Sequence, residues 1–579
     1  MSATQQAFRP RRNGRITIGC DFGNYGSSIA FISSKDGTNT KEISVIRDWP
    51  GAQQSMDKIP TRILYNSDAT VAKWGSALLS HEECIQYIKL LLDDSKEIPQ
   101  GISREGLLRE LKELDKSPQE VATDFLLQMH TVVVKEDSLM RKRYGDINVW
   151  NSEINWVMTV PAIWSDAAKN LTRQAAVNSG MGHNLMLVTE PEAAAVYTLT
   201  ESKSLNIRTG EIFVICDVGG GTTDLTTFGV EKTSPLRFCE VVGGQGALQG
   251  GAFVDAAFKS FIRESMGPAN YDAMLKMPYI WEAAMDRFQR NVKTQFNPYS
   301  NSDHAKNFWI RLDPRFDNKT AGIKNGHFTL TTERLRQMFD PTVEKVLEMI
   351  EQQVAAVKEF GEVPRSIILV GGFGQSPYLY HRVKERFGKT IQTIQPNQGE
   401  TAVVQGAVLQ AVSGGGLVTS RKARRAYGVP AWKEFDPKKH KSEKHWDPIE
   451  ERHCIHNGIE WFIKKGQNIK VGEIRTLPYK RHYPSDQDIE QLDDIQESLY
   501  AWDGDDPPEE MTNRMKPLCY LKVDRDELPK KAFKLRATKS GEKYMELSYE
   551  LGMSLDSGFL DFDLRIKDQV LGTVVAKFT

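Results

Sequence analysis

Two segments of the chain place an aspartate between an apolar β run and a glycine-rich turn. Residues 16–31 have the sequence ITIGCDFGNYGSSIAF, and residues 211–230 have the sequence EIFVICDVGGGTTDLTTFGV. A glycine turn presents backbone N–H groups to phosphate oxygens, because no Cβ blocks their approach. The aspartates before the turns, Asp21 and Asp217, repel phosphate and therefore require a divalent cation such as Mg²⁺. The two segments predict paired hairpins that clamp a polyphosphate from both sides of a cleft.

The elements around the hairpins follow the pattern of an α/β fold. The hairpins recur about 200 residues apart, a period far too long for a solenoid, which indicates a duplicated domain. A strand over 154–160 precedes a helix over 165–179 that Ser165 or Asp166 caps, and a strand over 185–188 leads through a turn at Glu190-Pro191 into an alanine-rich helix. Helical patterns cover 76–145, 282–294 and 332–360, and a buried strand over 366–370 precedes glycines and a helix from Ser376. Strands that alternate with helices in this way predict an α/β fold.

Composition shifts divide the chain into four parts. Residues 1–14 form an arginine-containing arm without an apolar stretch behind it, which predicts a flexible terminus rather than a secretory signal. Residues 15–205 and 206–416 each carry one hairpin and are the two predicted lobes. Residues 417–579 have more charge and end in alternating β-like runs, with an acidic, loop-like stretch over 486–510. We expect this last part to be a separate and mostly β region.

Five short motifs stand in one order along the chain, and together they resemble a known family. They are DFG at 21–23, VPA at 160–162, EPEAAA at 190–195, DVGGGTTD at 217–224 and VGG at 370–372. Each is a weak signal alone, but the ordered set resembles the DnaK-type heat-shock family of the actin-like ATPase superfamily over about residues 15–412. The resemblance implies a duplicated actin-like (ribonuclease H-like) ATPase core of two lobes around a nucleotide cleft, with ATP or ADP and Mg²⁺ as cofactors, plus the C-terminal β region.

The resemblance also implies roles for individual residues. Three aspartates would hold magnesium: Asp21, Asp217 and Asp224. Four residues would act in catalysis, with Glu190 beside the attacking water and Thr222 on the γ-phosphate: Glu190, Asp217, Thr222 and Lys89. The role of Lys89 depends on the short segment YIKLLLDD, and a solvated lysine on a helical face is the alternative. Further residues would contact the nucleotide: Gly23, Asn24, Tyr25, Gly219, Gly220, Gly221, Thr223, Gly250, Gly251, Gln289, Lys293, Gly371, Gly372, Phe373, Gln375 and Glu400.

The chain departs from the family pattern within the cleft. Asn24 and Tyr25 stand where the family has two threonines in the first phosphate loop, so two hydroxyl donors are missing at the γ-phosphate. Gln289 and Lys293 are the nearest counterparts of the polar pair that holds the adenine. Phe373 and Gln375 replace a serine and an arginine of the adenosine loop, which implies that another side chain holds the base.

The segment after the core departs as well. It reads AVSGGGLVTSRKARR instead of an acidic and apolar linker, and no peptide-binding sandwich is recognisable behind it. The chain is therefore similar to the divergent heat-shock branch, widespread in fungi and also found in animals, that keeps the ATPase core and replaces the rest. We expect its C-terminal region not to bind extended peptides in the usual chaperone manner.

Composition excludes several classes of function. A formal net charge of −1 predicts neither nucleic acid nor a membrane surface as partner, and no apolar run is long enough to span a bilayer. Six cysteines without paired spacing predict free thiols and a cytoplasmic location. Four histidines and Cys454 crowd into residues 440–456, but their spacing fits no closed zinc site and predicts a surface loop.

Several functions remain open at this stage. The leading hypothesis is a slow, chaperone-like ATPase that switches conformation around a protein client or a cofactor protein. The alternatives are a scaffold that binds nucleotide and hardly hydrolyses it, an ATP-dependent small-molecule phosphotransferase on the same fold, and a filament-forming protein. The VPA and EPEAAA motifs favour the first two, and the C-terminal region disfavours a filament. The sequence predicts no particular oligomeric state.

Overall fold

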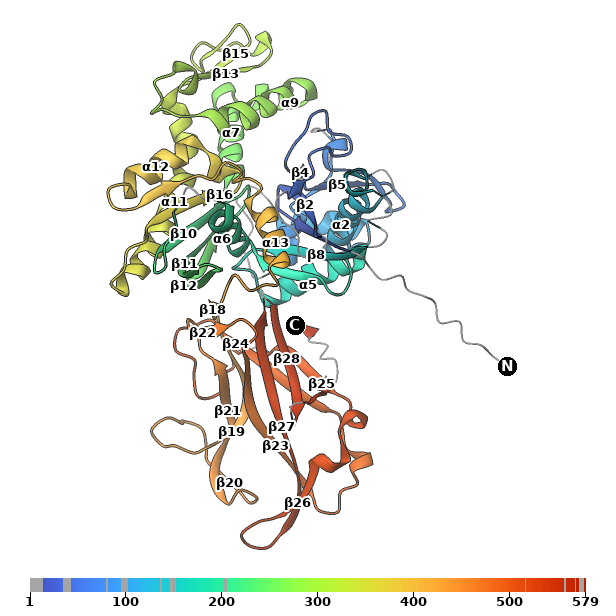
Figure 1. The fold of residues 1–579 in the computed structure, drawn as a ribbon. Coiled ribbons are helices and arrows are strands. Elements are labelled where there is room, and N and C mark those ends of the chain that lie inside the picture. The colour runs from blue at the N-terminus through green and yellow to red at the C-terminus, as the bar shows by residue number, and fades with distance from the viewer. Residues whose placement is uncertain are drawn as a thin grey trace. The chain divides into compact units, whose positions relative to one another are not determined.

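A computed structural model describes residues 14–34, 43–79, 82–94, 103–135, 138–145, 149, 152–201, 206–515, 517–556, 559–567, 569–571 and 577–578. The chain divides between Val418 and Thr419 into two compact units (Figure 1). The predicted N-terminal arm, residues 1–14, lies outside the described residues except for Gly14, which begins the first strand.

The first sheet of the N-terminal unit has the strand order β3-β2-β1-β8-β9, and β4 also pairs with β2. Strand β1 is antiparallel to β2 and parallel to β8, and β8 is parallel to β9. Thr17 and Ile18 of β1 point to opposite faces of the sheet and are both buried, as is typical of a central strand that is covered on both faces. The strands are β1 (Gly14–Asp21), β2 (Gly26–Ser34), β3 (Ser44–Val45), β4 (Ile59–Pro60), β8 (Ser152–Val160) and β9 (Met186–Thr189).

The second sheet repeats this topology with the order β12-β11-β10-β16-β17. Its central strand β10 is likewise antiparallel to the hairpin partner β11 and parallel to β16, and β16 is parallel to β17. Both predicted hairpins are therefore present, and the predicted duplication of an α/β unit is confirmed. The strands are β10 (Ile212–Val218), β11 (Thr223–Thr233), β12 (Leu236–Ala247), β16 (Ser366–Val370) and β17 (Gln392–Ile394).

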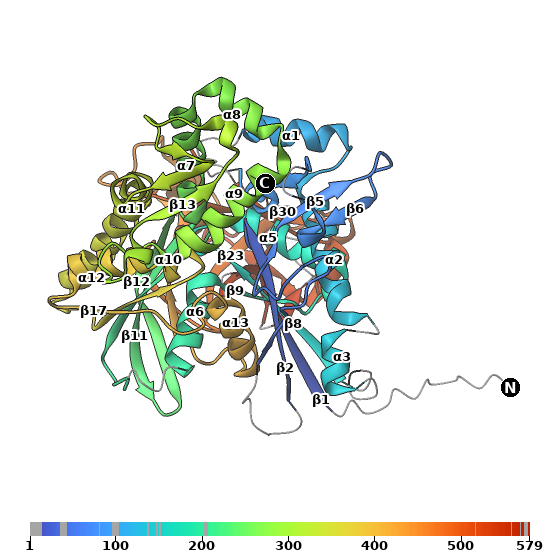
Figure 2. The ribbon, with the colours of Figure 1, turned by 90° about the horizontal axis from the view of Figure 1, so that it is seen from above.

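Two buried helices lie between the sheets, α6 (Glu190–Glu201) and α13 (Ala402–Val412) (Figure 2). Alanine, valine and glycine dominate α13, and α6 carries the run Ala193–Ala195; these small side chains let the backbones approach closely. At Gly406 of α13 a Cβ atom would lie 1.7 Å from the carbonyl oxygen of Ala193 in α6. Close packing of these helices therefore joins the two halves of the unit, and Glu190 is the first residue of α6.

The remaining helices cover the outer faces and form the outer parts of the unit. They are α1 (Arg104–Glu113), α2 (Pro118–Val134), α3 (Leu139–Tyr144), α5 (Asp166–Ala176), α7 (Gly251–Met266), α8 (Pro268–Leu275), α9 (Pro278–Arg287), α10 (Lys293–Gln295), α11 (Thr332–Glu359) and α12 (Pro377–Phe387). A π-helical turn, Phe288–Val292, links α9 to α10. Ser165 caps α5, as one of the two predicted alternatives. No described helix has the length and apolar character that crossing a membrane requires.

Three predictions of local structure are wrong. Among the described residues of 76–145, α-helix begins at Arg104, and the described part before it forms one short strand (Ile85–Gln86) and 3-10 turns. Glu190 and Pro191 begin α6 and do not form a separate turn, since proline is tolerated in the first turn of a helix. The acidic stretch 486–510 contains strand β24 (Ile495–Trp502), whose Ile495 and Leu499 are fully buried in the core.

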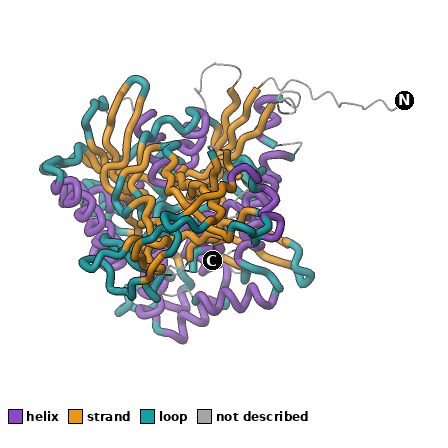
Figure 3. The backbone as a smooth tube through the Cα atoms, turned by 90° about the horizontal axis from the view of Figure 1, so that it is seen from below, coloured by secondary structure: helices purple, strands orange, loops and turns teal. Residues whose placement is uncertain are grey.

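The C-terminal unit is built of β-strands, which Figure 3 shows together with the mixed helix and strand of the other unit. One sheet has the order β20-β21-β19-β24-β25-β30, and the other has the order β23-β27-β28-β29 with β26 beside β27. Both are antiparallel and bury apolar side chains in one shared core, including Leu499 of β24 and Leu551 of β27. The strand-rich prediction is confirmed, but the unit is a two-sheet sandwich. No sandwich was recognisable from the sequence, because charged residues interrupt the apolar pattern of these strands.

The strands of this unit alternate core and solvent positions only in part. They are β18 (Ser420–Lys422), β19 (Ala426–Glu434), β20 (His445–Asp447), β21 (Arg452–Ile463), β22 (Asn468–Lys470), β23 (Ile474–Pro484), β24 (Ile495–Trp502), β25 (Pro517–Val523), β26 (Phe533–Ala537), β27 (Lys543–Asp556), β28 (Phe559–Ile566), β29 (Gln569–Leu571) and β30 (Lys577–Phe578).

Candidate functional site

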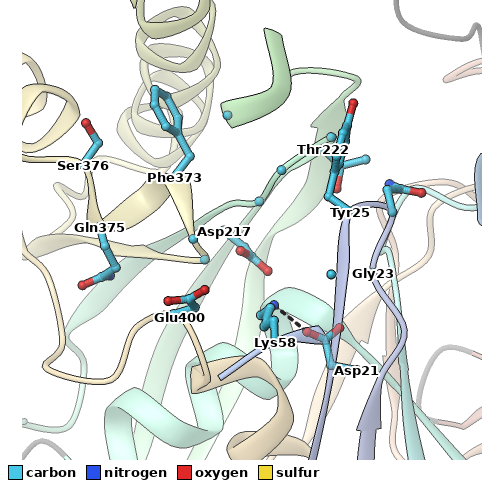
Figure 4. A pocket seen from close by; sticks show the side chains of 18 of the residues that line it. Asp21, Gly23, Tyr25, Lys58, Asp217, Thr222, Phe373, Gln375, Ser376 and Glu400 are labelled. Atoms are coloured by element: carbon cyan, nitrogen blue, oxygen red, sulfur yellow. Dashed lines mark hydrogen bonds and ion pairs between the residues drawn. The ribbon is translucent and has the colours of Figure 1, made fainter. Parts of the chain in front are cut away.

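Both glycine-rich hairpins face one cavity of about 490 Å³ within the N-terminal unit (Figure 4). Most of the predicted site residues line it: Asp21, Gly23, Asn24, Tyr25, Lys89, Glu190, Asp217, Gly219, Gly220, Gly221, Thr222, Gly251, Gln289, Lys293, Gly371, Gly372, Phe373, Gln375 and Glu400. Three predicted residues do not line it: Thr223, Asp224 and Gly250. Five lining residues were missed from the sequence: Gly26, Lys58, Pro60, Thr294 and Ser376.

Asp21 ends β1 at the base of the first loop and is almost fully buried. Its Oδ1 accepts a hydrogen bond from the Thr159 hydroxyl at 2.9 Å, and its Oδ2 accepts one from the Lys58 ammonium at 2.8 Å. Burial by itself would raise the pKa of Asp21, but the positive charges of Lys58 and Lys89 and the two hydrogen bonds outweigh it and lower the pKa. Asp21 is therefore a carboxylate in this site.

The second loop is held by the start of helix α7. The N–H of Gly251 donates to the carbonyl of Gly219 at 3.1 Å, and the N–H of Ala252 donates to the carbonyl of Gly220 at 2.8 Å. In a trans peptide the N–H points opposite to the carbonyl, so the N–H groups of Gly220 and Gly221 point away from α7. Both glycines line the cavity, and the loop therefore offers it backbone donors. Gly250 supports this contact, because a Cβ there would lie 2.6 Å from the Gly219 carbonyl oxygen.

Lys89 and Glu190 form a buried ion pair at the cavity floor. Their Nζ and Oε1 atoms lie 2.6 Å apart, and only 2% of the Lys89 side chain and 9% of the Glu190 side chain are exposed. Lys89 belongs to a 3-10 turn, Ile88–Leu92, and also lies 5.2 Å from the centre of a Trp164 ring. The alternative of a solvated lysine on a helical face is therefore wrong. Lys89 holds Glu190 in place on the cavity wall.

The cavity holds more buried carboxyl groups than its buried lysines neutralise. Burial raises the pKa of Asp217 to about 7, with Glu190 adding to the shift and Lys58 opposing it. Burial also raises the pKa of Glu190 against the opposing charge of Lys89. Asp224 lies buried behind the loop, and burial together with Glu190 and Asp217 raises its pKa well above the usual value. Because burial and neighbouring carboxyl groups disfavour the ionised form of these side chains, a bound cation would stabilise it.

The other predicted nucleotide contacts come from two segments of the second half: residues 371–400, and the helical residues Gln289 and Lys293. Gly371 has a φ of +83°, and a Cβ there would lie 2.2 Å from Oδ1 of Asp217, so only glycine fits. Phe373 is largely buried and packs near Phe339, while Glu400 is solvent-exposed at the rim. Lys293 pairs with both carboxylate oxygens of Asp255 at 2.8 Å, and Gln289 donates to the same carboxylate at 3.1 Å.

Thr223 and Tyr25, both predicted to contact the nucleotide, contact other parts of the protein. The hydroxyl of Thr223 donates to the carbonyl of Gln249 at 2.9 Å, and its side chain is fully buried. Tyr25 packs directly against the second loop: a Cβ at Gly220 would lie 2.8 Å from its ring, and one at Gly221 would lie 2.7 Å from it. The Tyr25 ring also meets Tyr87 edge to face, with centroids 5.1 Å apart. Tyr25 therefore bridges the two phosphate loops.

Lys58 is the most important residue that sequence reasoning missed. It stands in the segment MDKIPT, where one lysine before a two-residue strand forms no motif. Only the pairing of β4 with β2 brings it to the first loop. Proximity to Asp21 could not be inferred, because 37 residues separate the two positions.

The residues suit magnesium bound together with a phosphate group. Among the residues that the structure describes, no three His, Cys, Asp or Glu side chains gather to hold a metal by themselves. Mg²⁺ usually keeps several waters and is held by one or two carboxylates plus phosphates of the substrate. Asp21 and Asp217, the unneutralised carboxyl groups and the glycine donors fit such a group.

The duplicated sheets, the crossing helices α6 and α13 and the facing glycine loops define the class: this is a nucleotide-binding, actin-like ATPase fold. The model of the Hsp70 protein family matches residues 109–420, which is more than half of the chain. The chain belongs to the Hsp70 family. Other members of this family bind nucleotide with Mg²⁺.

Two human relatives match over most of the chain. Heat shock 70 kDa protein 12B is 23% identical over 542 residues, which cover 79% of this chain and 77% of the relative. Heat shock 70 kDa protein 12A is 23% identical over 557 residues, which cover 81% of this chain and 80% of the relative. The matched regions extend beyond the ATPase core, so the likeness includes part of the C-terminal unit.

Proposed function

We propose that this chain binds ATP and ADP with Mg²⁺ and that slow ATP hydrolysis switches its conformation around a protein client. The observation that carries the proposal is the pair of hairpins that brings Asp21 and Asp217 to one cavity, which the Lys89–Glu190 ion pair also lines. A chaperone-like role and a cytoplasmic location rest on the family and on composition, and both stay predictions.

Each residue has a defined task in this proposal. Asp21 and Asp217 would hold Mg²⁺, which when bound would supply the positive charge that offsets the phosphates. The Thr222 hydroxyl and the N–H groups of Gly220 and Gly221 bind the γ-phosphate, as hydrogen-bond donors that are already in place. Glu190 orients the attacking water, and Lys89 fixes the Glu190 carboxylate at 2.6 Å.

A nucleotide titration with and without Mg²⁺, paired with a turnover assay, tests the proposal. We expect ATP and ADP to bind, and to bind much more weakly once EDTA removes Mg²⁺, because buried carboxylates would then face uncompensated phosphate. Release of phosphate to water, without an added acceptor, distinguishes an ATPase from a phosphotransferase. Affinity that is equal with and without Mg²⁺ would refute the proposed clamp.

A second candidate is a scaffold that holds nucleotide and hardly turns it over. The observation that favours it is the Tyr25 side chain, which fills the space beside Gly220 and Gly221 where the sequence pattern of the family provides small hydroxyl residues. Tight ATP binding combined with no detectable phosphate release would select this function over the leading one.

The C-terminal unit gives a separate prediction. We expect the full chain not to bind a short apolar peptide in a manner that ATP reverses. The C-terminal unit is a sandwich, although none was recognisable from the sequence. The segment that follows α13 is nevertheless glycine-rich and basic instead of acidic and apolar, and the expectation depends on that difference. Fluorescence anisotropy of a labelled apolar peptide, with and without ATP, checks it. Tight binding that ATP releases would show that the sandwich takes peptides.

A further inference from the structure

Lys58 is fixed beside the first phosphate loop by the sheet. Strand β4 pairs with the start of β2, where Pro60 lies opposite Gly26 and Ile59 opposite Ser27. The N–H of Thr61 donates to the carbonyl of Tyr25 at 3.0 Å, and the hydroxyls of Thr61 and Ser27 lie 2.9 Å apart. The backbone of Lys58 is therefore held against the loop that lacks the two hydroxyl donors.

The ammonium of Lys58 lies within the cavity. Figure 4 shows it between Asp21 on one side and Asp217 and Glu400 on the other. Its side chain is 22% exposed, and Asp21 is its only hydrogen-bond acceptor among the described residues. The group is a cation with donors to spare, because a lysine ammonium carries three N–H bonds.

We propose that Lys58 is a phosphate-binding residue that supplies, at the first loop, donors in place of the hydroxyls absent at Asn24 and Tyr25. One N–H keeps its hydrogen bond to Asp21, whose buried negative charge would otherwise face the phosphates uncompensated. Another N–H donates to a phosphate oxygen. The inference rests on the proposed nucleotide binding and adds a residue to it. It explains how a loop without threonines still holds an anion.

A purely structural role is the competing account. In that account the Lys58 side chain only shapes the empty cavity, and its charge has no part in ligand binding. Removal of the Lys58 side chain would then lower the affinities for adenosine, AMP, ADP and ATP by similar factors, because the change in cavity shape does not depend on how many phosphates the ligand carries. A phosphate contact predicts the opposite, a loss that appears only once the ligand reaches the first loop with its β- and γ-phosphates.

Calorimetric titration of the full chain with AMP, ADP and ATP in the presence of Mg²⁺ tests the inference. For Lys58→Met we expect ADP and ATP affinities to fall roughly 10- to 100-fold, the loss typical of one charge-assisted hydrogen bond, and AMP affinity to fall less than about threefold. Lys58→Arg keeps the charge and should restore most of the loss. The matched control is Lys73→Met, which removes a lysine that pairs with Glu82 outside the cavity and should change none of the affinities.

A footprinting experiment on the unmodified chain keeps the inference testable if Lys58→Met does not fold. Amine acylation of Lys58 should slow when pyrophosphate or ADP is bound, should not slow with adenosine, and should leave Lys73 unaffected. Equal losses for AMP, ADP and ATP, or no protection by pyrophosphate, would overturn the role of Lys58 alone. Absence of any ADP or ATP binding by the unmodified chain would overturn the proposed function and this inference with it.

Discussion

Asp217→Ala should weaken Mg²⁺-dependent binding of ADP and ATP by roughly 10- to 100-fold. The substitution removes a buried carboxylate at the end of β10 that faces the cavity and, in the proposed function, holds the ion on the phosphates. Loss of a hydrogen bond to a charged group typically costs about 1.5–3 kcal/mol, which corresponds to that range of affinity. Titration of each nucleotide against the variant, with and without Mg²⁺, measures the effect.

Asp217→Asn is the matched control for shape. Burial and Glu190 raise the pKa of Asp217 to about 7, so above that pH Asp217 is ionised and its buried charge lowers the stability of the folded, nucleotide-free protein. A neutral amide of the same size should therefore leave the free protein at least as stable at pH 8, as thermal unfolding would show, while Mg²⁺ dependence is lost. If both variants bind nucleotide as the parent does, Asp217 is not a ligand of the ion.

Combined replacement of Asn24→Thr and Tyr25→Thr should accelerate single-turnover ATP hydrolysis by about a hundredfold. Phosphoryl transfer depends mainly on positioning and on stabilising charge at the γ-phosphate, and one well-placed donor typically contributes about 3 kcal/mol. The parent loop offers no threonine hydroxyl at these two positions: the Tyr25 ring packs on Gly220 and Gly221, and its phenolic hydroxyl is hydrogen-bonded with Tyr87. The double variant adds hydroxyls and clears the space beside the second loop.

The single variant Asn24→Thr separates the two effects. It adds one hydroxyl but keeps the Tyr25 ring between the loops, so we expect a smaller gain than for the pair. Quench-flow measurement of the first turnover gives the hydrolysis rate of the parent and of each variant, and ATP affinity is determined in parallel. A double variant that binds ATP normally and is no faster, or a parent that already turns over briskly, would show that the loss of hydroxyls does not limit hydrolysis. The Tyr25 contact with Tyr87 would then be the feature to explain.

Much of the site could be predicted because its motifs are local. An aspartate at the end of an apolar β run, followed by glycines, specifies a strand and a tight turn within ten residues, and both hairpins formed as predicted. Gly371 is a second example, since only glycine fits its positive φ and its close approach to Asp217. Where local chemistry decides the backbone, the sequence is sufficient to place the residue on the cavity wall.

Local pattern failed where burial or pairing across the fold decides the outcome. Lys89 has the appearance of an exposed lysine in YIKLLLDD, yet it is buried because Glu190, 101 residues away, meets it at 2.6 Å. The C-terminal sandwich was not recognised because its core joins Leu499 and Leu551 from different sheets, while charged residues dominate the stretches between its strands. Neither contact leaves a periodic signal in the sequence.

The sequence by itself determined the ATPase class, the two phosphate loops and the aspartates at their bases, because those features depend on residue type over a few positions. The tertiary structure alone decided which lysines enter the cavity and which residue bridges its walls. Lys58 reaches Asp21 through the pairing of β4 with β2, and Tyr25 reaches Gly220 because the two sheets face each other across one cavity. Such contacts join positions far apart in the chain, and only packing of the whole unit brings them together.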